Sequence, residues 1–435
     1  MEVQTEILVK EKHLLGESPF YDPRSKTFTW VDILRGEFWR LSETGEKTCF
    51  ALGQPVGAAV PAGKKNAEKA FSYVLAAKDG LYLWQKDEAS LLYALKDIYQ
   101  DWQRSNDAKA DPAGRLWFGS SCADDDHAPA GNLYRYEGNE AVLMQAGTKI
   151  ANGMAWSSDR KSFYFADSEE HAVFVYDYDL WTGNIKNRRV LFTVENGVPD
   201  GMCIDTEDNL WLAVWGGSRV EKRSGRTGEL LDVISLPAVQ VTSCCFGGEK
   251  MDMLYITSAA TGLTGEADGC VFRCRVGARG KAPDYFKVDP YRFYGWQEAL
   301  VPARTDGFPG VDTPREMYDI LSGIWCAATC APRMRDEWKA DNPTFGQCSI
   351  TAFLVQDIFG GEVRGILRPG GNYHCYNVVD GHVFDLTSEQ FGDEILDYRD
   401  NPIQLREVHF AKEEKRQRYF ILKEKLREYC KRRSI

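Results

Sequence analysis

Four oxygen-bearing side chains recur at one position of a repeating pattern in the first half of the chain. Glu17, Asn106, Asn152 and Asp200 lie in the turn-like sequences GESP, SNDA, ANGM and PDGM, each 11 to 13 residues before a large aromatic residue. Two carboxylates and two amides that converge suit a hard divalent cation such as Ca²⁺, Mg²⁺ or Mn²⁺. No His or Cys shares the position, which argues against a thiolate or imidazole zinc site, although zinc also accepts carboxylates. The competing interpretation is that Asn-Gly and Asp-Gly only form turns.

A cysteine, a histidine and an aspartate in the last quarter of the chain form a second candidate set. Cys348 falls in the first turn of a predicted helix, where backbone N–H groups and the helix dipole lower the pKa of a thiol. His374 and Asp385 lie on two strand-like runs joined by an Asp-Gly turn, so they can be neighbours. This order of residues is found in papain-like and transglutaminase-like enzymes. A buried cysteine beside a core histidine is an equally good interpretation of the sequence.

The elements that must position the first set form a repeat of about 45 residues. The runs FTWVD, FSYVLA, RLWFGS, SFYFAD, NLWLAV and MLYITS follow one another at spacings of 43 to 47 residues, and each precedes a second alternating run. Strand pairs at this period are typical of β-propeller blades. We therefore predict an all-β, six-bladed β-propeller over residues 1–282, closed by pairing of the N-terminal VQTEILVK with the last blade. An array of β-sandwiches fits less well because it lacks so regular a period.

The second set lies in a different kind of sequence. The β period stops after residue 282, and five prolines mark residues 283–314 as a joining segment. Residues 315–435 alternate helical and strand-like patterns, which predicts a smaller α+β domain with a basic C-terminal helix over about 406–433.

The helix that carries Cys348 has its own start and stop signals. Asn342 or Thr344 is expected to cap it, and Thr344 and Gln347 have the spacing of a capping box. Gly360 and Gly361 are expected to end it.

Composition excludes several classes of protein. The chain has 435 residues, 43% of them hydrophobic and 27% charged, which is typical of a globular protein. A net charge of −11 disfavours nucleic-acid binding. No apolar run reaches membrane-spanning length, and the first residues lack a secretory signal pattern. We expect a cytoplasmic protein that contacts neither membrane nor nucleic acid, with its 12 cysteines as thiols.

Longer stretches resemble a known family. LLGESPFYDP, RSNDAKADPAGRLWFGS, ANGMAWSSDRKSFYFADS and PDGMCIDTEDNLWLAVWGG are similar to the regucalcin (senescence marker protein 30) and gluconolactonase family, over about residues 14–282. The resemblance implies a six-bladed propeller that holds one divalent cation (Ca²⁺, Mg²⁺, Mn²⁺ or Zn²⁺) and hydrolyses a small-molecule sugar lactone.

The resemblance also implies roles for individual residues. Glu17, Asn152 and Asp200 would be the metal ligands. The residues that would contact the substrate are Arg104, Asn106 and Asp124. Asp124 stands where animal members usually carry Glu, which bears on substrate preference. In this chemistry the metal polarises the lactone carbonyl and activates a water, and Asp200, in preference to Glu17, takes the proton.

Two alternative functions remain open at this point. The propeller could be a calcium-binding or metal-binding regulatory module without turnover. The C-terminal domain, which resembles YunG-like proteins over about residues 321–391, could be a thiol hydrolase or acyl transferase that uses Cys348, His374 and Asp385.

Overall fold

The computed structural model describes residues 3–63, 72–122, 127, 130–138, 140–180, 182–288, 291, 293–340, 342–392 and 394–433. The chain divides into two compact units, Met1–Asp289 and Pro290–Ile435. The division falls inside the Pro-rich segment 283–314.

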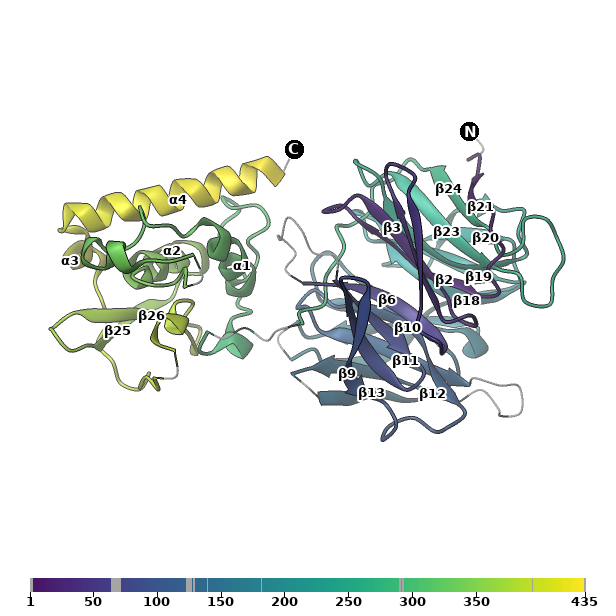
Figure 1. Ribbon diagram of the computed structural model, residues 1–435, viewed down its shortest axis with the longest axis horizontal. Helices are drawn as coiled ribbons and strands as arrows, with labels where there is room; N and C mark the ends of the chain where they lie inside the picture. The colour runs from purple at the N-terminus through teal and green to yellow at the C-terminus, as the bar shows by residue number, and fades with distance from the viewer. Residues whose placement is uncertain are drawn as a thin grey trace. The chain divides into compact units, whose positions relative to one another are not determined.

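The first unit consists of six four-stranded antiparallel sheets, the arrangement of a six-bladed β-propeller (Figure 1). Each sheet uses consecutive strands, with the sixth completed by β1. The first three sheets contain β2 (Gly16–Asp22), β3 (Thr27–Asp32), β4 (Glu37–Ser42) and β5 (Lys47–Ala51); β6 (Val56–Ala62), β7 (Ser72–Ala77), β8 (Gly80–Gln85) and β9 (Glu88–Ala94); and β10 (Gln103–Ala110), β11 (Leu116–Cys122), β12 (Gly131–Glu137) and β13 (Glu140–Thr148). The other three contain β14 (Ala151–Trp156), β15 (Ser162–Asp167), β16 (Ala172–Tyr178) and β17 (Ile185–Thr193); β18 (Val198–Ile204), β19 (Asn209–Trp215), β20 (Arg219–Ser224) and β21 (Leu230–Ser235); and β22 (Gln240–Gly247), β23 (Met253–Ala259), β24 (Val271–Arg275) and β1 (Glu6–Val9).

The sheets form a closed ring. The first strand of each sheet contacts the first strands of the two neighbouring sheets, in the cyclic order β2, β6, β10, β14, β18 and β22. β1 pairs antiparallel with β24, with Ile7 opposite Phe272, so the last sheet is built from both ends of the unit. This confirms the predicted closure. Closure leaves the ring without an open edge between its first and last blades and fixes six inner strands around one axis.

Buried aspartates hold the hairpins between first and second strands. Asp111 Oδ1 accepts hydrogen bonds from the backbone N–H groups of Ala113 and Arg115, both at 2.9 Å. Asp111 Oδ2 accepts from Arg115 Nε at 2.7 Å and from the Tyr178 hydroxyl of the next blade at 2.8 Å. Asp205 repeats part of this pattern, because it accepts from Trp211 Nε1 as Asp111 does from the corresponding indole. Asp111 therefore stabilises its own turn and also links its blade to the next one.

The second unit combines helices with one small sheet. The sheet has the order β25-β26-β27, and α2 packs against β26 and α4. Its main elements are α1 (Pro314–Ile324), α2 (Cys348–Phe359), β25 (Glu362–Leu367), β26 (Tyr373–Val379), β27 (His382–Phe384), α3 (Arg406–Phe410) and α4 (Glu413–Arg433). Short 3-10 turns in the chain are η1 (Ser168–Glu170), η2 (Trp296–Glu298), η3 (Pro332–Glu337) and η4 (Ser388–Phe391). None of the helices described is both long and apolar enough to cross a bilayer.

Two local predictions for this unit were wrong. Gln347, not Asn342 or Thr344, is the N-cap of α2, and no side chain caps that helix. The Thr344 hydroxyl instead donates to Asn342 Oδ1 within the preceding turn, so the two expected capping side chains bond to each other and not to the helix. The basic C-terminal segment is two helices and not one, because α3 ends at Phe410 and α4 begins at Glu413. Gly360 ends α2 with φ 76°, as its sequence indicated.

The buried pair of Asp111 and Arg115 provides a test of how the blades are held together. Asp111→Asn is expected to lower the free energy of unfolding of the propeller by about 3 kcal/mol, because the buried Arg115 loses a carboxylate. Denaturant unfolding followed by tryptophan fluorescence measures this change. Asp177→Asn, which breaks the exposed pair with Arg189, is the matched control and should leave the free energy of unfolding nearly unchanged. Equal effects of the two variants would contradict the assignment.

Candidate functional site

A backbone irregularity on the inner strands aims side chains into the centre of the propeller. The pairing register shifts between Glu17 and Phe20 on β2, between Ala151 and Met154 on β14, and between Pro199 and Met202 on β18. Such β-bulges re-aim the side chains beside them. Ser18 adopts φ 49° directly after Glu17. The three predicted metal ligands, Glu17, Asn152 and Asp200, all lie at these shifts and are only 5 to 6% exposed.

The amides in this centre are tied together by hydrogen bonds. Asn106 Nδ2 donates to Asn152 Oδ1 at 2.8 Å, which joins two of the predicted residues from adjacent blades. Arg104 Nη1 donates to Asn106 Oδ1 at 2.7 Å. Asn152 Nδ2 donates to Ser168 Oγ at 2.9 Å, and Ser168 in turn donates to the carbonyl of Pro199. These bonds fix the Asn152 amide with its oxygen toward Asn106.

The two carboxylates are buried close to each other. Burial and the charge of Asp107 raise the pKa of Glu17 to about 8. Burial and the charges of Glu17 and Asp107 raise the pKa of Asp200 well above its usual range. Asp200 Oδ1 is buried and has no hydrogen-bond partner among the residues described. The two carboxyl groups are therefore costly to ionise in this centre, although Arg104 lies nearby, and they favour binding of a proton or a cation.

This donor set fits a divalent cation. Carboxylate and amide oxygens are the ligands that hard cations prefer, and an added positive charge would relieve the repulsion between Glu17 and Asp200. Within the described part of the chain, no group of three or more His, Cys, Asp or Glu side chains is placed to hold a metal. A cation bound here would therefore need the amide of Asn152 as well as the two carboxylates.

Sequence reasoning missed several contributors to the centre. Asp107 was overlooked because it follows Asn106, and in a regular strand the next side chain would face the opposite side; the register shift between Ser105 and Ala108 removes that alternation. Ser168 lies beyond the repeat position, in η1.

The second blade gives no ligand because Gly57 stands against the backbone: a Cβ there would meet the Asn106 carbonyl oxygen at 2.2 Å. Asp124 lies outside the described residues.

The structure brings the second predicted set together as well. His374 lies on β26, and Asp385 directly follows β27. The distance from His374 Nε2 to Asp385 Oδ2 is 2.5 Å. Asp385 Oδ2 also accepts from the Tyr398 hydroxyl at 3.0 Å, and its other oxygen accepts from the backbone and hydroxyl of Thr387. Asp385 is therefore fully engaged and holds the imidazole in one orientation. His374 and Asp385 are 2% and 1% exposed.

Cys348 lies in the same cavity as this histidine. His374 Nδ1, the ring nitrogen that does not contact Asp385, is buried and has no hydrogen-bond partner among the residues described. Burial disfavours the thiolate, but the neighbouring His374 outweighs this effect and lowers the pKa of Cys348. Burial likewise opposes the imidazolium, but the charge and hydrogen bond of Asp385 raise the pKa of His374 to about 10. These directions favour a thiolate–imidazolium pair at neutral pH.

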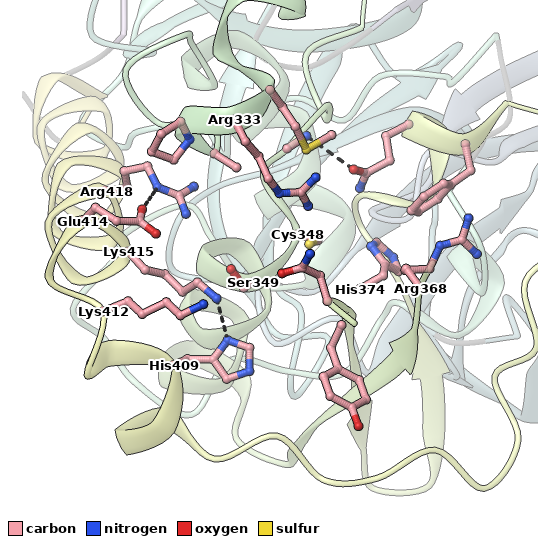
Figure 2. Close-up of a pocket in the computed structure, with 18 of the residues that line it drawn as sticks. Arg333, Cys348, Ser349, Arg368, His374, His409, Lys412, Glu414, Lys415 and Arg418 are labelled. Carbon is pink, nitrogen blue, oxygen red and sulfur yellow. Dashed lines mark hydrogen bonds and ion pairs between the residues drawn. The ribbon is translucent and has the colours of Figure 1, made fainter. Parts of the chain in front are cut away.

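Cys348 opens onto a cavity of about 530 Å³ (Figure 2). Cys348, Ser349 and His374 line its floor, together with residues from η3, η4 and α4. α2 begins at Cys348 without a side-chain cap, so the first-turn N–H groups are not satisfied by one. Cys375, which follows His374 on β26, is buried, and burial raises its pKa well above the usual range. A partly exposed cysteine with a lowered pKa differs in kind from such a core thiol.

Comparison with known proteins agrees with this division. The model of the SMP-30/Gluconolactonase/LRE-like region matches residues 15–260, and the model of the YunG protein matches residues 313–431. Regucalcin of Danio rerio is 34% identical over 308 residues, which cover 67% of this chain and 99% of that protein.

Solved structures resemble the propeller. A luciferin-regenerating enzyme is 32% identical with a TM-score of 0.61, over 66% of this chain and 99% of that one. A calcium-binding protein, regucalcin, from Agrobacterium tumefaciens is 26% identical with a TM-score of 0.61, over 66% of this chain and 98% of that one. The chain thus belongs to the SMP-30/gluconolactonase/LRE-like family, and its C-terminal unit is a YunG domain.

Proposed function

We propose that the propeller is a metal-dependent lactonase that hydrolyses a sugar lactone. The observation that carries the proposal is the buried pair of Glu17 and Asp200, whose pKa values are raised by burial and by neighbouring carboxylates even with Arg104 nearby, beside the oriented amide of Asn152. Membership in a family named for gluconolactonase supports the reaction class. Glu17, Asn152 and Asp200 would hold the cation, which is Ca²⁺, Mg²⁺, Mn²⁺ or Zn²⁺. When bound, such a cation polarises the lactone carbonyl and makes a water more acidic.

The protein's own groups would orient the substrate and move the proton. Arg104 and Asn106 present a guanidinium and an amide that can bind substrate hydroxyls or the ring oxygen. Asp124 is proposed as a further substrate contact. Asp200 Oδ1, which has no hydrogen bond of its own among the described residues, would take the proton of the attacking water. The carbonyl carbon gains the hydroxyl, its bond to the ring oxygen breaks, and that oxygen receives the proton to give a sugar acid.

Asp200→Asn is expected to reduce kcat/KM for glucono-δ-lactone by about 10³-fold or more, and to weaken metal binding measured by calorimetry by about 100-fold. The same variant should raise the Tm of the metal-free protein, because it removes one of two repelling buried carboxylates. Asp232→Asn, on the exposed outer strand β21 of the same blade, is the control and should change none of these. Full turnover by Asp200→Asn would refute the assignment.

Arg104→Met separates substrate binding from metal binding. The loss of a charged hydrogen-bond donor should lower kcat/KM by about 10- to 100-fold, mostly through KM. Metal affinity should be retained or strengthened, because Arg104 carries a positive charge close to Glu17 and Asp200. If metal binds but neither the wild type nor this variant turns over any lactone, the propeller is instead a metal-binding regulatory module. Arg104 and Asn106 favour the enzyme, since metal binding alone does not require them.

A second activity is proposed for the C-terminal domain, namely that of a thiol hydrolase or acyl transferase with the residue order of papain-like and transglutaminase-like enzymes. Its support is the bond between His374 and Asp385 and the position of Cys348 beside His374 in the lining of one cavity. Cys348 Sγ would attack an acyl carbon and form a thioester while the leaving group takes a proton from His374. Water, or an acceptor amine, would then cleave the thioester and return the proton to His374.

The thiolate can be detected without a substrate. Iodoacetamide should modify Cys348 before the other thiols at pH 7, and its rate should stay high as pH falls until the pH passes below the lowered pKa of the thiol. Asp385→Asn removes the charge that raises the pKa of His374, so the rate profile should move to higher pH. Mass spectrometry of the Cys348 peptide measures the rate, with the neighbouring core thiol Cys375 as internal control. Slow labelling of Cys348, with the pH dependence of an ordinary thiol, would support the core-cysteine interpretation.

A further inference from the structure

The cavity above Cys348 is strongly basic. Among the residues that the structure describes, five Lys or Arg side chains line it against one carboxylate, that of Glu414: they are Arg333, Arg368, Lys412, Lys415 and Arg418. We propose that this cavity binds an anionic group of the substrate, a carboxylate or a phosphate, and so presents an acyl carbon to Cys348. This inference rests on the thiol activity proposed above and names the chemical class of its substrate.

Two of the five cations are already neutralised. Arg368 Nη2 lies 2.7 and 2.9 Å from the two oxygens of Glu394. Arg418 Nε donates to Glu414 at 3.0 Å, and its Nη1 donates to the carbonyl of Thr329. These two side chains are held in place by their partners and form the walls of the cavity.

The other three cations have no carboxylate partner among the described residues. Arg333, on η3, and Lys412, between α3 and α4, make no side-chain hydrogen bond or ion pair in that part of the chain. Lys415 Nζ lies 3.0 Å from His409 Nδ1. A protein surface seldom concentrates unpaired cations around a concave space without a counter-ion to fill it.

His409 holds Lys415 without cancelling its charge. Burial and the charges of Lys415 and Lys412 lower the pKa of His409 to about 4, so the ring is neutral at physiological pH. His409 Nε2 donates to Gln404 Oε1 at 3.0 Å, which leaves Nδ1 as the acceptor for Lys415. The lysine is therefore oriented by a neutral partner that adds no negative charge to the cavity.

The anion would sit beside the nucleophile. Figure 2 shows Lys412 and Lys415 on one side of the cavity, Arg333 above and Cys348 with His374 between them and Arg368. A volume of about 530 Å³ accommodates a small metabolite. The uncapped start of α2 lies at the same point, where its N–H groups can stabilise negative charge on an acyl oxygen.

Two alkylating reagents that differ in charge test the inference. Rates of modification of the Cys348 peptide are measured for iodoacetate and for iodoacetamide, and their ratio is compared with that of N-acetylcysteine amide in the same buffer. We expect a ratio about tenfold higher at Cys348, falling as salt rises. Lys412→Gln and Arg333→Gln should each lower the ratio severalfold, whereas Lys431→Gln, at an exposed lysine on α4 outside the cavity, should not.

The two reagents separate the inference from the activity on which it rests. Slow iodoacetamide labelling of Cys348 would overturn the thiol activity itself. Rapid iodoacetamide labelling with an iodoacetate ratio no higher than that of the free thiol would overturn the anion site alone. Protection of Cys348 by gluconate but not by inorganic phosphate would assign a carboxylate substrate, and the reverse would assign a phosphate.

Discussion

The central constraint on the propeller is that it buries two carboxylates close together, where they repel each other. Glu17 and Asp200 come from strands 183 residues apart in sequence, and only a closed ring of six inner strands brings them to one axis. Each is desolvated, Asp107 adds to their charge, and Asp200 Oδ1 has no partner among the residues described. Folding therefore creates an electrostatic cost that the proposed cation would offset. The bulges, the amide network and the ring closure all serve to hold this strained centre in one geometry.

The C-terminal unit solves a different electrostatic problem in a similar way. Asp385 accepts hydrogen bonds on both oxygens, which holds its negative charge beside His374. That charge raises the pKa of His374, and His374 in turn lowers the pKa of Cys348. In the propeller the buried groups are carboxylates with raised pKa values, and the proposed ligand is a cation. In the YunG domain the uncompensated charge around the cavity is positive and suits an anion. The proposed lactonase reaction releases a carboxylate, which is one of the anions that the proposed basic cavity would bind.

Much of this arrangement follows from the sequence, and the exceptions have physical reasons. The period of the aromatic runs predicted the propeller, because each blade must bury the same kind of face, and the N-terminal strand pairs where expected. The repeat position of Glu17, Asn152 and Asp200 also predicted their proximity. Asp107 escaped detection because a bulge, invisible in the alternation pattern, turns it inward. The cap of α2 was wrong because short polar side chains there bond to each other, and the basic cavity was missed because its cations come from three distant segments.

The most direct test of the central claim is hydrolysis of glucono-δ-lactone by the metal-stripped Cys348→Ala variant, with Ca²⁺, Mg²⁺, Mn²⁺ or Zn²⁺ added back one at a time. The account predicts no turnover above the uncatalysed rate without metal and restored turnover with at least one cation, because the propeller centre acts without the thiol. Turnover that persists after complete removal of metal, or that no cation restores, would contradict it.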